Sequence, residues 1–250
     1  MLEENFVTGD SLIHRLDPRA RAVVCILFAI VVALSSRFAS LLPALMVSFV
    51  LVWLAGLPIR LVFSRLLIVN GFVLLLWLFL PFTVTGEVLF RIGPLAITRQ
   101  GVLFAAQITI KANAIMLSLI ALLATMSVFT LGGAMGHLHV PGKIVHLVYF
   151  TYRYIQVMHQ EYYRLISAMK IRGFHPGNNI HTYKTYAYLV GMLLVKSYDR
   201  AERIRAAMLC RAFRGTFYNL SEFSMGSFDV LVMGFMLLAI AGIGALEWVL

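Results

Sequence analysis

Long apolar runs without a charged residue dominate this sequence and restrict what it can fold into. Residues 112–131 contain 20 consecutive uncharged positions, and about 20 apolar residues are what a helix needs to cross the hydrocarbon core of a bilayer. Charged residues make up 13% of the 250-residue chain, and the mean hydropathy is +0.88. Because a typical soluble domain has about 25% charged residues, this composition excludes an ordinary soluble domain, a disordered chain and a disulfide scaffold.

Five such runs predict five membrane-spanning helices, at residues 22–36, 38–59, 66–86, 101–131 and 228–246. The first run is short for a span, but the arginines that flank it, Arg21 and Arg37, can extend to the headgroups. Because only Arg37 and its neighbours separate the first two runs, we expect these runs to form a tight hairpin. The expected fold class is an all-α integral membrane protein with about five transmembrane helices.

The region between the fourth and fifth runs is strongly basic. Residues 132–214 contain 12 Lys or Arg and three acidic residues, a net charge of +9 out of +10 for the whole chain. Lys and Arg are retained on the cytoplasmic side of membrane proteins. We therefore expect this region and the N-terminus to be cytoplasmic and the C-terminus external. The expected domains are four spans over 1–131, a cytoplasmic domain over 132–216 and a final transmembrane helix over 217–250.

The basic region itself predicts two long helices. Residues 143–172 contain no proline and place apolar side chains at helical spacing, and Gly173 and Pro176 suit the end of that helix. A second helix is expected over about 183–213. Each helix would have about 30 residues and a length of about 45 Å. Both are too charged to span a bilayer, so they must pack on each other, on the membrane surface or on a partner.

Polar residues inside the predicted spans allow more than one interpretation. Lys111 is either a functional group or a side chain that extends to a nearby membrane interface. Asn70, Gln107 and Asn113 are expected to join helices or to face another subunit.

Other polar residues lie outside the predicted spans. His137, His139 and His146 are either metal ligands or polar residues at the cytoplasmic interface, and no cysteine or carboxylate completes a metal shell around them. Asp17 and Pro18 suit the N-cap and the first position of a helix. The two cysteines of the chain are not expected to form a disulfide, since they lie far apart in sequence.

A short repeat marks the ends of the two basic helices. Residues 168–174 read Ala-Met-Lys-Ile-Arg-Gly-Phe and residues 207–213 read Ala-Met-Leu-Cys-Arg-Ala-Phe, with four of seven positions identical at an offset of 39. One such end could be explained by the helix dipole and by the preference for glycine after a helix. Two matching ends instead favour docking, because a small residue beside an arginine lets a partner backbone approach while the guanidinium reaches a carboxylate.

These features resemble the transmembrane T component of energy-coupling factor (ECF) transporters, in particular its cobalt and nickel branch, CbiQ. The resemblance rests on Leu-Asp-Pro-Arg-Ala at 16–20, Val-Pro at 140–141, Thr-Tyr-Arg-Tyr-Ile at 151–155 and the two arginine motifs, the second of which continues as Arg214-Gly215. It covers residues 16–215. One position departs from the pattern: Ala212 stands where glycine is common in the family.

The resemblance implies a transport subunit that is not an enzyme and holds no cofactor. Its partners would be two ABC-type ATPase subunits, a separate substrate-binding membrane subunit that binds cobalt, and membrane lipid, without nucleic acid. It would lie in the inner membrane of a bacterium or archaeon and support cobalt uptake for cobalamin biosynthesis, with nickel or a vitamin as alternative cargo. The two basic helices would be coupling helices, and the residues implied to contact the ATPases are Ala168, Met169, Ile171, Arg172, Gly173, Ala207, Met208, Cys210, Arg211 and Ala212.

A nucleotide site is not evident in the sequence. The nearest approach to a P-loop, at 136–144, is one residue too long and has no Ser or Thr after its lysine, so ATP would be hydrolysed by other chains. A rival interpretation of the basic region is a membrane protein that uses it to bind anionic lipid or nucleic acid.

Overall fold

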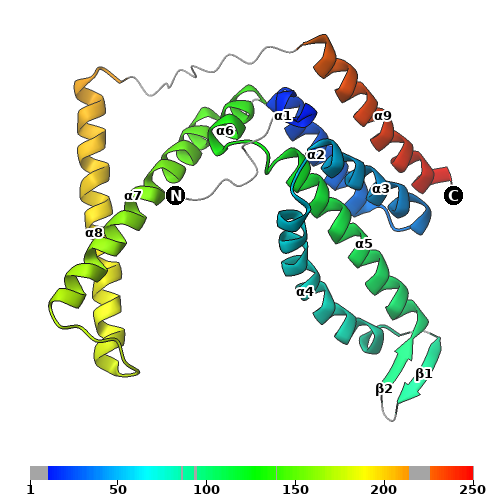
Figure 1. The fold of residues 1–250 in the computed structure, drawn as a ribbon, viewed down its shortest axis with the longest axis horizontal. Helices are drawn as coiled ribbons and strands as arrows, with labels where there is room; N and C mark the ends of the chain where they lie inside the picture. The colour runs from blue at the N-terminus through cyan, green and yellow to red at the C-terminus, as the bar shows by residue number, and fades with distance from the viewer. Residues whose placement is uncertain (1–10, 86, 93–94, 139, 214–225, 250) are drawn as a thin grey trace. The chain divides into compact units, whose positions relative to one another are not determined.

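The computed structural model describes residues 11–85, 87–92, 95–138, 140–213 and 226–249. The chain divides into two compact units (Figure 1). The membrane unit comprises residues 4–138 and 222–250, and the coupling unit comprises residues 139–221. The sequence had placed the corresponding boundaries at 132 and 217.

The membrane unit is built almost entirely from helices. Its helices are α1 (Leu12–Arg15), α2 (Pro18–Leu34), α3 (Phe38–Leu54), α4 (Ile59–Thr83), α5 (Arg99–Leu122), α6 (Val128–His137) and α9 (Ser227–Val249). Between α4 and α5 lies an antiparallel hairpin of β1 (Val88–Ile92) and β2 (Leu95–Thr98), in which Val88 pairs with Thr98 and Ile92 with Leu95. The all-α class is confirmed for the unit as a whole, and the hairpin is an element that the sequence analysis did not predict.

Three described helices are long and apolar enough to cross a membrane: α4, α5 and residues Ser227–Trp248 of α9, with 25, 24 and 22 residues. Helix α3 is apolar but shorter, and the count of five spans stays a prediction. The expected fourth span, 101–131, is wrong at its C-terminal end, since α5 ends at Leu122. A new helix then begins because Ser127 caps α6, its hydroxyl accepting a hydrogen bond from the Thr130 N–H at 3.1 Å.

The boundaries of two further spans also differ from the sequence prediction. Helix α3 ends at Leu54 rather than near residue 59, and Gly56 follows it with a φ of +61°. Helix α4 begins at Ile59 rather than at residue 66, so Arg60 and Arg65 lie within its first two turns. Because arginine is a good helix former, charge alone did not mark the start of this helix.

The start of α2 has the cap that the sequence predicted. Asp17 is the N-cap, its Oδ1 accepts a hydrogen bond from the Arg19 N–H at 2.8 Å, and Pro18 occupies the first helical position. One turn on, the buried Arg21 donates through Nη1 to the Thr125 hydroxyl at 3.2 Å. This bond links the beginning of α2 to the turn that follows α5.

The core of the membrane unit lies where α2, α3, α5 and α9 pack together. Its fully buried members include Cys25, Phe28 and Leu41 together with small residues such as Ala114 and Ala121. Small side chains let helix backbones approach closely, which is how transmembrane helices pack. Helix α4 packs on α5 and on β2 and leaves most of its apolar side chains exposed.

The coupling unit consists of two long helices, α7 (Gly142–Ile171) and α8 (Ile180–Cys210), which contact each other and cross (Figure 1). The expected helices at 143–172 and 183–213 are confirmed to within three residues at each end. Asn179 caps α8, since its side-chain oxygen accepts a hydrogen bond from the Thr182 N–H at 2.8 Å. Most side chains of both helices remain exposed.

Candidate functional site

The two repeated segments form the same kind of helix end. At the end of α7, the Phe174 N–H donates to the Met169 carbonyl at 3.1 Å and the Gly173 N–H donates to the Lys170 carbonyl at 3.0 Å. This pair of bonds is the Schellman motif, in which a residue of positive φ follows the C-cap. Gly173 has a φ of +77°, a conformation that glycine adopts without steric cost.

The end of α8 repeats both bonds of this motif, although the C-cap N–H of Arg211 donates to the Met208 carbonyl, three residues back, whereas that of Arg172 donates to the Ala168 carbonyl, four residues back. The Phe213 N–H donates to the Met208 carbonyl at 3.1 Å, and the Ala212 N–H donates to the Leu209 carbonyl at 3.0 Å. Ala212 has a φ of +56° and is the one described residue other than glycine with a positive φ. An L-residue with a Cβ pays about 1–2 kcal/mol in this conformation. The sequence match at an offset of 39 therefore reflects a shared backbone shape, which α8 keeps although alanine is strained there.

Both ends present their arginine to the surroundings. Arg172 and Arg211 are the C-cap residues, and both are exposed. Among the described residues neither guanidinium has an ion-pair partner. The apolar Ile171 and Leu209 beside them are 87% and 61% exposed. A charged group and an apolar group lie together on each end without a partner from within the described chain.

The phenylalanine of each repeat turns back onto the helix pair. The Phe174 ring packs edge-on against Tyr186 near the start of α8, with 5.8 Å between ring centroids. Phe213 lines an apolar groove of about 390 Å³ between α7 and α8, together with Phe150 and Tyr154 of α7. Each phenylalanine thus anchors its helix end, so that the preceding arginine and small residue face outward from a fixed base.

The ten residues implied to contact ATPases fall into two separate groups. The structure brings Ala168, Met169, Ile171, Arg172 and Gly173 together at the end of α7, and Ala207, Met208, Cys210, Arg211 and Ala212 at the end of α8. Because the helices run in opposite directions, the groups lie on either side of the crossing (Figure 1).

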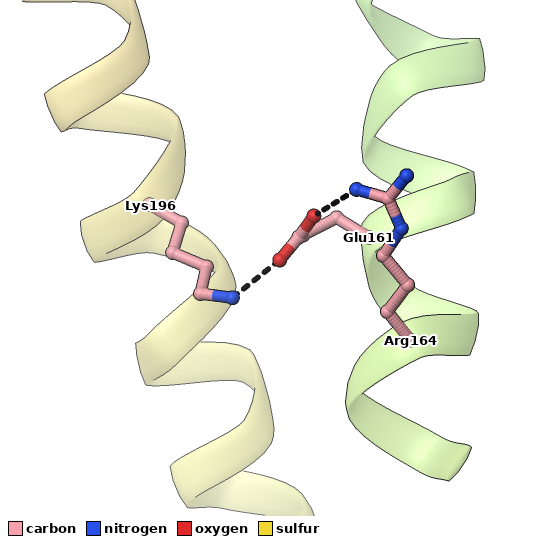
Figure 2. Close-up of polar contacts among 3 residues, drawn as sticks. All are labelled: Glu161, Arg164 and Lys196. Carbon is pink, nitrogen blue, oxygen red and sulfur yellow. Dashed lines mark hydrogen bonds and ion pairs between the residues drawn. The ribbon is translucent and has the colours of Figure 1, made fainter. Parts of the chain in front are cut away.

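One residue that the sequence analysis missed lies at the crossing itself. Glu161 of α7 has a side chain that is only 10% exposed, and its carboxylate pairs with Lys196 of α8 and with Arg164 of α7, the latter at 3.4 Å (Figure 2). The hydrogen bond from Lys196 is the main reason that the pKa of Glu161 lies below its ordinary value. The sequence did contain one sign that could have identified Glu161: no other acidic residue occurs between 132 and 198.

The polar residues within the apolar helices of the membrane unit bond to neighbouring helices. The Lys111 ammonium donates to the Ala33 carbonyl at 3.1 Å, and Gln107 donates to the Ser36 carbonyl at 2.6 Å, so both satisfy carbonyl groups at the end of α2. Asn70 and Asn113 exchange two hydrogen bonds at 3.2 and 3.0 Å. The expectation that intramembrane amides join helices is confirmed for these residues.

The histidines offer no described metal centre. No three His, Cys, Asp or Glu side chains within the described ranges are arranged to hold a metal ion. Both His137 and His146 have other interactions, and His139 lies outside the described residues.

The fold and this site define a class: a helical membrane protein that carries a basic pair of helices with two matched, arginine-bearing ends. The chain belongs to the CbiQ family, described as cobalt transport protein, which matches residues 9–221. This confirms the resemblance drawn from the sequence motifs.

Three curated relatives of the chain carry the same description, energy-coupling factor transporter transmembrane protein EcfT. The protein from Heliobacterium modesticaldum is 31% identical, covering 84% of this chain and 83% of its own length. The protein from Ruminiclostridium cellulolyticum is 24% identical over 98% of this chain and 96% of its own length. The protein from Streptococcus equi is 27% identical over 84% of this chain and 82% of its own.

Proposed function

We propose that the chain is the transmembrane coupling subunit of an ECF-type importer, which transmits ATP-driven motion from two ATPase subunits to a separate substrate-binding membrane subunit. Its family and its relatives support the role of a transport component in the cell membrane. The observation that carries the proposal is the pair of matching Schellman ends, each with an exposed arginine. Two equivalent ends suit a partner that offers two equivalent grooves.

Each end has the features that docking requires. No atom lies within 4 Å of the place where a Cβ would stand on Gly173, so a partner backbone can come close to the helix end. The neighbouring Arg172 guanidinium can then bind a carboxylate through two parallel hydrogen bonds. The same arrangement recurs at Arg211 and Ala212 on α8. A rigid helix transmits a push at either end along its length, which is the kind of rigid-body shift by which transport proteins change state.

The docking role is tested by reversing the charge of both ends. Truncating one partner of a buried charge pair costs about 2–5 kcal/mol, so Arg172→Ala or Arg211→Ala alone should weaken assembly with the ATPase pair. The double variant Arg172→Glu with Arg211→Glu should abolish it, and lysine should restore it poorly because it lacks the bidentate fork. A role limited to the helix dipole would cost only about 0.3–1 kcal/mol and would tolerate lysine.

The measurement is co-purification of both ATPases with each variant, together with ATP-dependent uptake by the complex. A matched control is Lys184→Glu with Arg203→Glu, which makes the same change in net charge at two exposed sites of α8 outside the ten residues implied in docking. This control should assemble normally. If the double reversal at Arg172 and Arg211 still binds both ATPases and transports, the docking role is wrong. The chain purified alone should hydrolyse no ATP.

Cobalt is the cargo that we propose, on the basis of the family description. Selectivity would belong to the substrate-binding subunit rather than to this chain. Uptake of radioactive cobalt by the complete complex in proteoliposomes tests this assignment, with nickel and a vitamin as the competing cargoes. Uptake of a vitamin but not of cobalt would overturn the cargo and leave the coupling role in place.

A further inference from the structure

Very little buried surface joins the two helices of the coupling unit. In the described part of this unit the buried residues are Val145, Glu161, Thr182 and Leu189. Thr182 bonds to Asn179 within the start of α8. Of these four residues, Glu161 is the one whose polar atoms bond to the other helix. Glu161 therefore supplies the buried polar contact across the crossing, in addition to apolar contacts such as that of the Phe174 ring with Tyr186.

The contacts of Glu161 are divided between the two helices. Its Oε1 pairs with the Lys196 ammonium of α8, and its Oε2 accepts a hydrogen bond from Arg164 of its own helix (Figure 2). A carboxylate removed from water needs such partners, because an unpaired buried charge is costly. The Lys196 contact fixes how α7 and α8 lie against each other, whereas the Arg164 contact remains within one helix.

The crossing lies between the two arginine-bearing ends. Arg172 is 11 residues from Glu161, and Arg211 is 15 residues from Lys196. At about 1.5 Å of rise per residue, the arms are about 16 and about 22 Å long. A rotation of about 10° at the crossing would move the end of the longer arm by about 4 Å. A shift of that size would break a hydrogen bond, because the bond is lost once its donor–acceptor distance grows beyond about 3.5 Å.

We infer that Glu161 is a positioning residue, which holds the spacing of the two arginine-bearing ends so that both can dock on a two-subunit partner at once. The inference rests on the proposed function and extends it from the ends to the joint between them. Loss of the Glu161–Lys196 pair would leave each end intact. It would let the distance between the ends vary, so that docking of one end would no longer place the other in its groove.

The spacing can be measured directly in the full chain. Spin labels at Lys170→Cys and Ala206→Cys lie on exposed sites next to the two ends, outside the ten residues implied in docking. The background is Cys25→Ala with Cys210→Ser, which removes both natural thiols. Electron–electron double resonance of this protein in lipid nanodiscs should give a single narrow distribution of distances.

The variants separate the contact between helices from the contact within one helix. Glu161→Gln and Lys196→Gln each remove the bond across the crossing and should broaden the distribution. Arg164→Gln is the matched control, because it removes a partner of the same carboxylate from within α7, and it should keep the narrow distribution. The exchange Glu161→Lys with Lys196→Glu restores opposite charges across the crossing and should narrow the distribution again. Co-purification of the ATPase pair is measured for every variant without labels.

The inference predicts that assembly falls in step with the broadening and returns with the charge exchange. A narrow distribution in Glu161→Gln would overturn it. A broad distribution with full assembly would also overturn it, because docking would then not need a fixed spacing. Neither result would contradict the proposed function. That function fails only if the variant Arg172→Glu with Arg211→Glu still assembles with both ATPases and transports.

Discussion

Glu247, near the end of α9, binds Ser36 in the turn between α2 and α3. Its Oε1 accepts hydrogen bonds from the Ser36 N–H at 2.9 Å and from the Ser36 hydroxyl at 2.8 Å. Its Oε2 accepts from the Arg37 N–H and from the Ser40 hydroxyl. The same carboxylate therefore caps the start of α3 and joins it to α9, across 211 positions of sequence.

The other acidic residue of α9 makes a similar contact at the opposite end. Asp229 accepts a hydrogen bond from the Asp17 N–H at 3.3 Å, at the start of α2, and another from the Gly226 N–H at 2.9 Å. The two carboxylates of α9 thus lie at the two ends of α2. Apolar packing alone permits a helix to slide or rotate, and the bonds of these two carboxylates fix the position of α9 against α2.

Replacing Glu247 should therefore destabilise the membrane unit. In Glu247→Gln the amide group faces donors that need an acceptor, and a neutral amide makes weaker hydrogen bonds than a carboxylate. The fully buried Cys25 reports unfolding through a thiol-reactive fluorophore, in a Cys210→Ser background. We expect a lower midpoint than that of Glu202→Gln, which makes the same charge change at an exposed site of α8. Equal midpoints would show that the contact contributes nothing.

The strained end of α8 predicts that opposite exchanges of glycine and alanine stabilise this helix at two of its positions. Ala212→Gly should stabilise the end by about 1 kcal/mol, because it removes the Cβ from a residue of positive φ. The matched change Gly191→Ala, in the helix interior with open space around its Cβ, should also stabilise α8, by about 0.5–1 kcal/mol. At the end of α7 the change Gly173→Ala should destabilise the helix end, because it adds a Cβ to a residue of positive φ.

Amide exchange of Phe213 and Phe174 measures these changes, because their N–H groups close the two ends. Exchange at Phe213 should slow in Ala212→Gly and exchange at Phe174 should speed up in Gly173→Ala. Unchanged exchange at Phe213 in Ala212→Gly would mean that the alanine is not strained there.

The crossing of α7 and α8 should resist mild acid. The hydrogen bond from Lys196, with help from Arg164, lowers the pKa of Glu161 below its ordinary value of 4.5. A group whose pKa is lowered by folding contributes stability above its unfolded pKa and loses it as the pH falls through the folded value. The spin-label distribution should therefore stay narrow as the pH falls from neutral and broaden only at a pH below the ordinary pKa of a glutamate.

Glu161→Gln is the control for this acid response. Its distribution should be broad at every pH, because glutamine carries no charge to titrate. A wild-type distribution that broadens already near pH 6 would contradict the assignment, since histidines titrate there instead.

Features with a local physical cause could be predicted from the sequence. Asp17 and Pro18 formed the expected helix start because a cap depends on two or three neighbouring residues. The ends at Arg172 and Arg211 were visible for the same reason, as a repeated cap sequence on helices with a clear 3.6-residue period. The hairpin also had a local signal, a Gly-Pro pair at 93–94, which the charged residues around it obscured.

Features that depend on distant contacts could not be predicted in this way. Glu161 and Lys196 are 35 positions apart, and Glu247 and Ser36 are 211 positions apart. Nothing in a single sequence states which distant partner a carboxylate meets. Lys111 is a similar case, because the sequence showed an ion at membrane depth, whereas the carbonyl it satisfies belongs to Ala33 on another helix.

The distribution of charge predicts the orientation of the chain in the membrane. Residues 132–214 carry 12 Lys or Arg against three acidic residues, and placing one Lys or Arg at the bilayer centre costs about 2.5–3.5 kcal/mol on insertion scales. The coupling unit should therefore be cytoplasmic and the end of α9 external.

On a background of Cys25→Ala with Cys210→Ser, a membrane-impermeant maleimide should label Trp248→Cys, a position 92% exposed, in intact cells. Lys184→Cys should be labelled only after permeabilisation. The natural Cys25 alone, which is fully buried, should stay unlabelled from both sides until the protein is denatured. Labelling of Lys184→Cys in intact cells would place the coupling unit outside, where no ATPase could dock, and would overturn both the orientation and the coupling role.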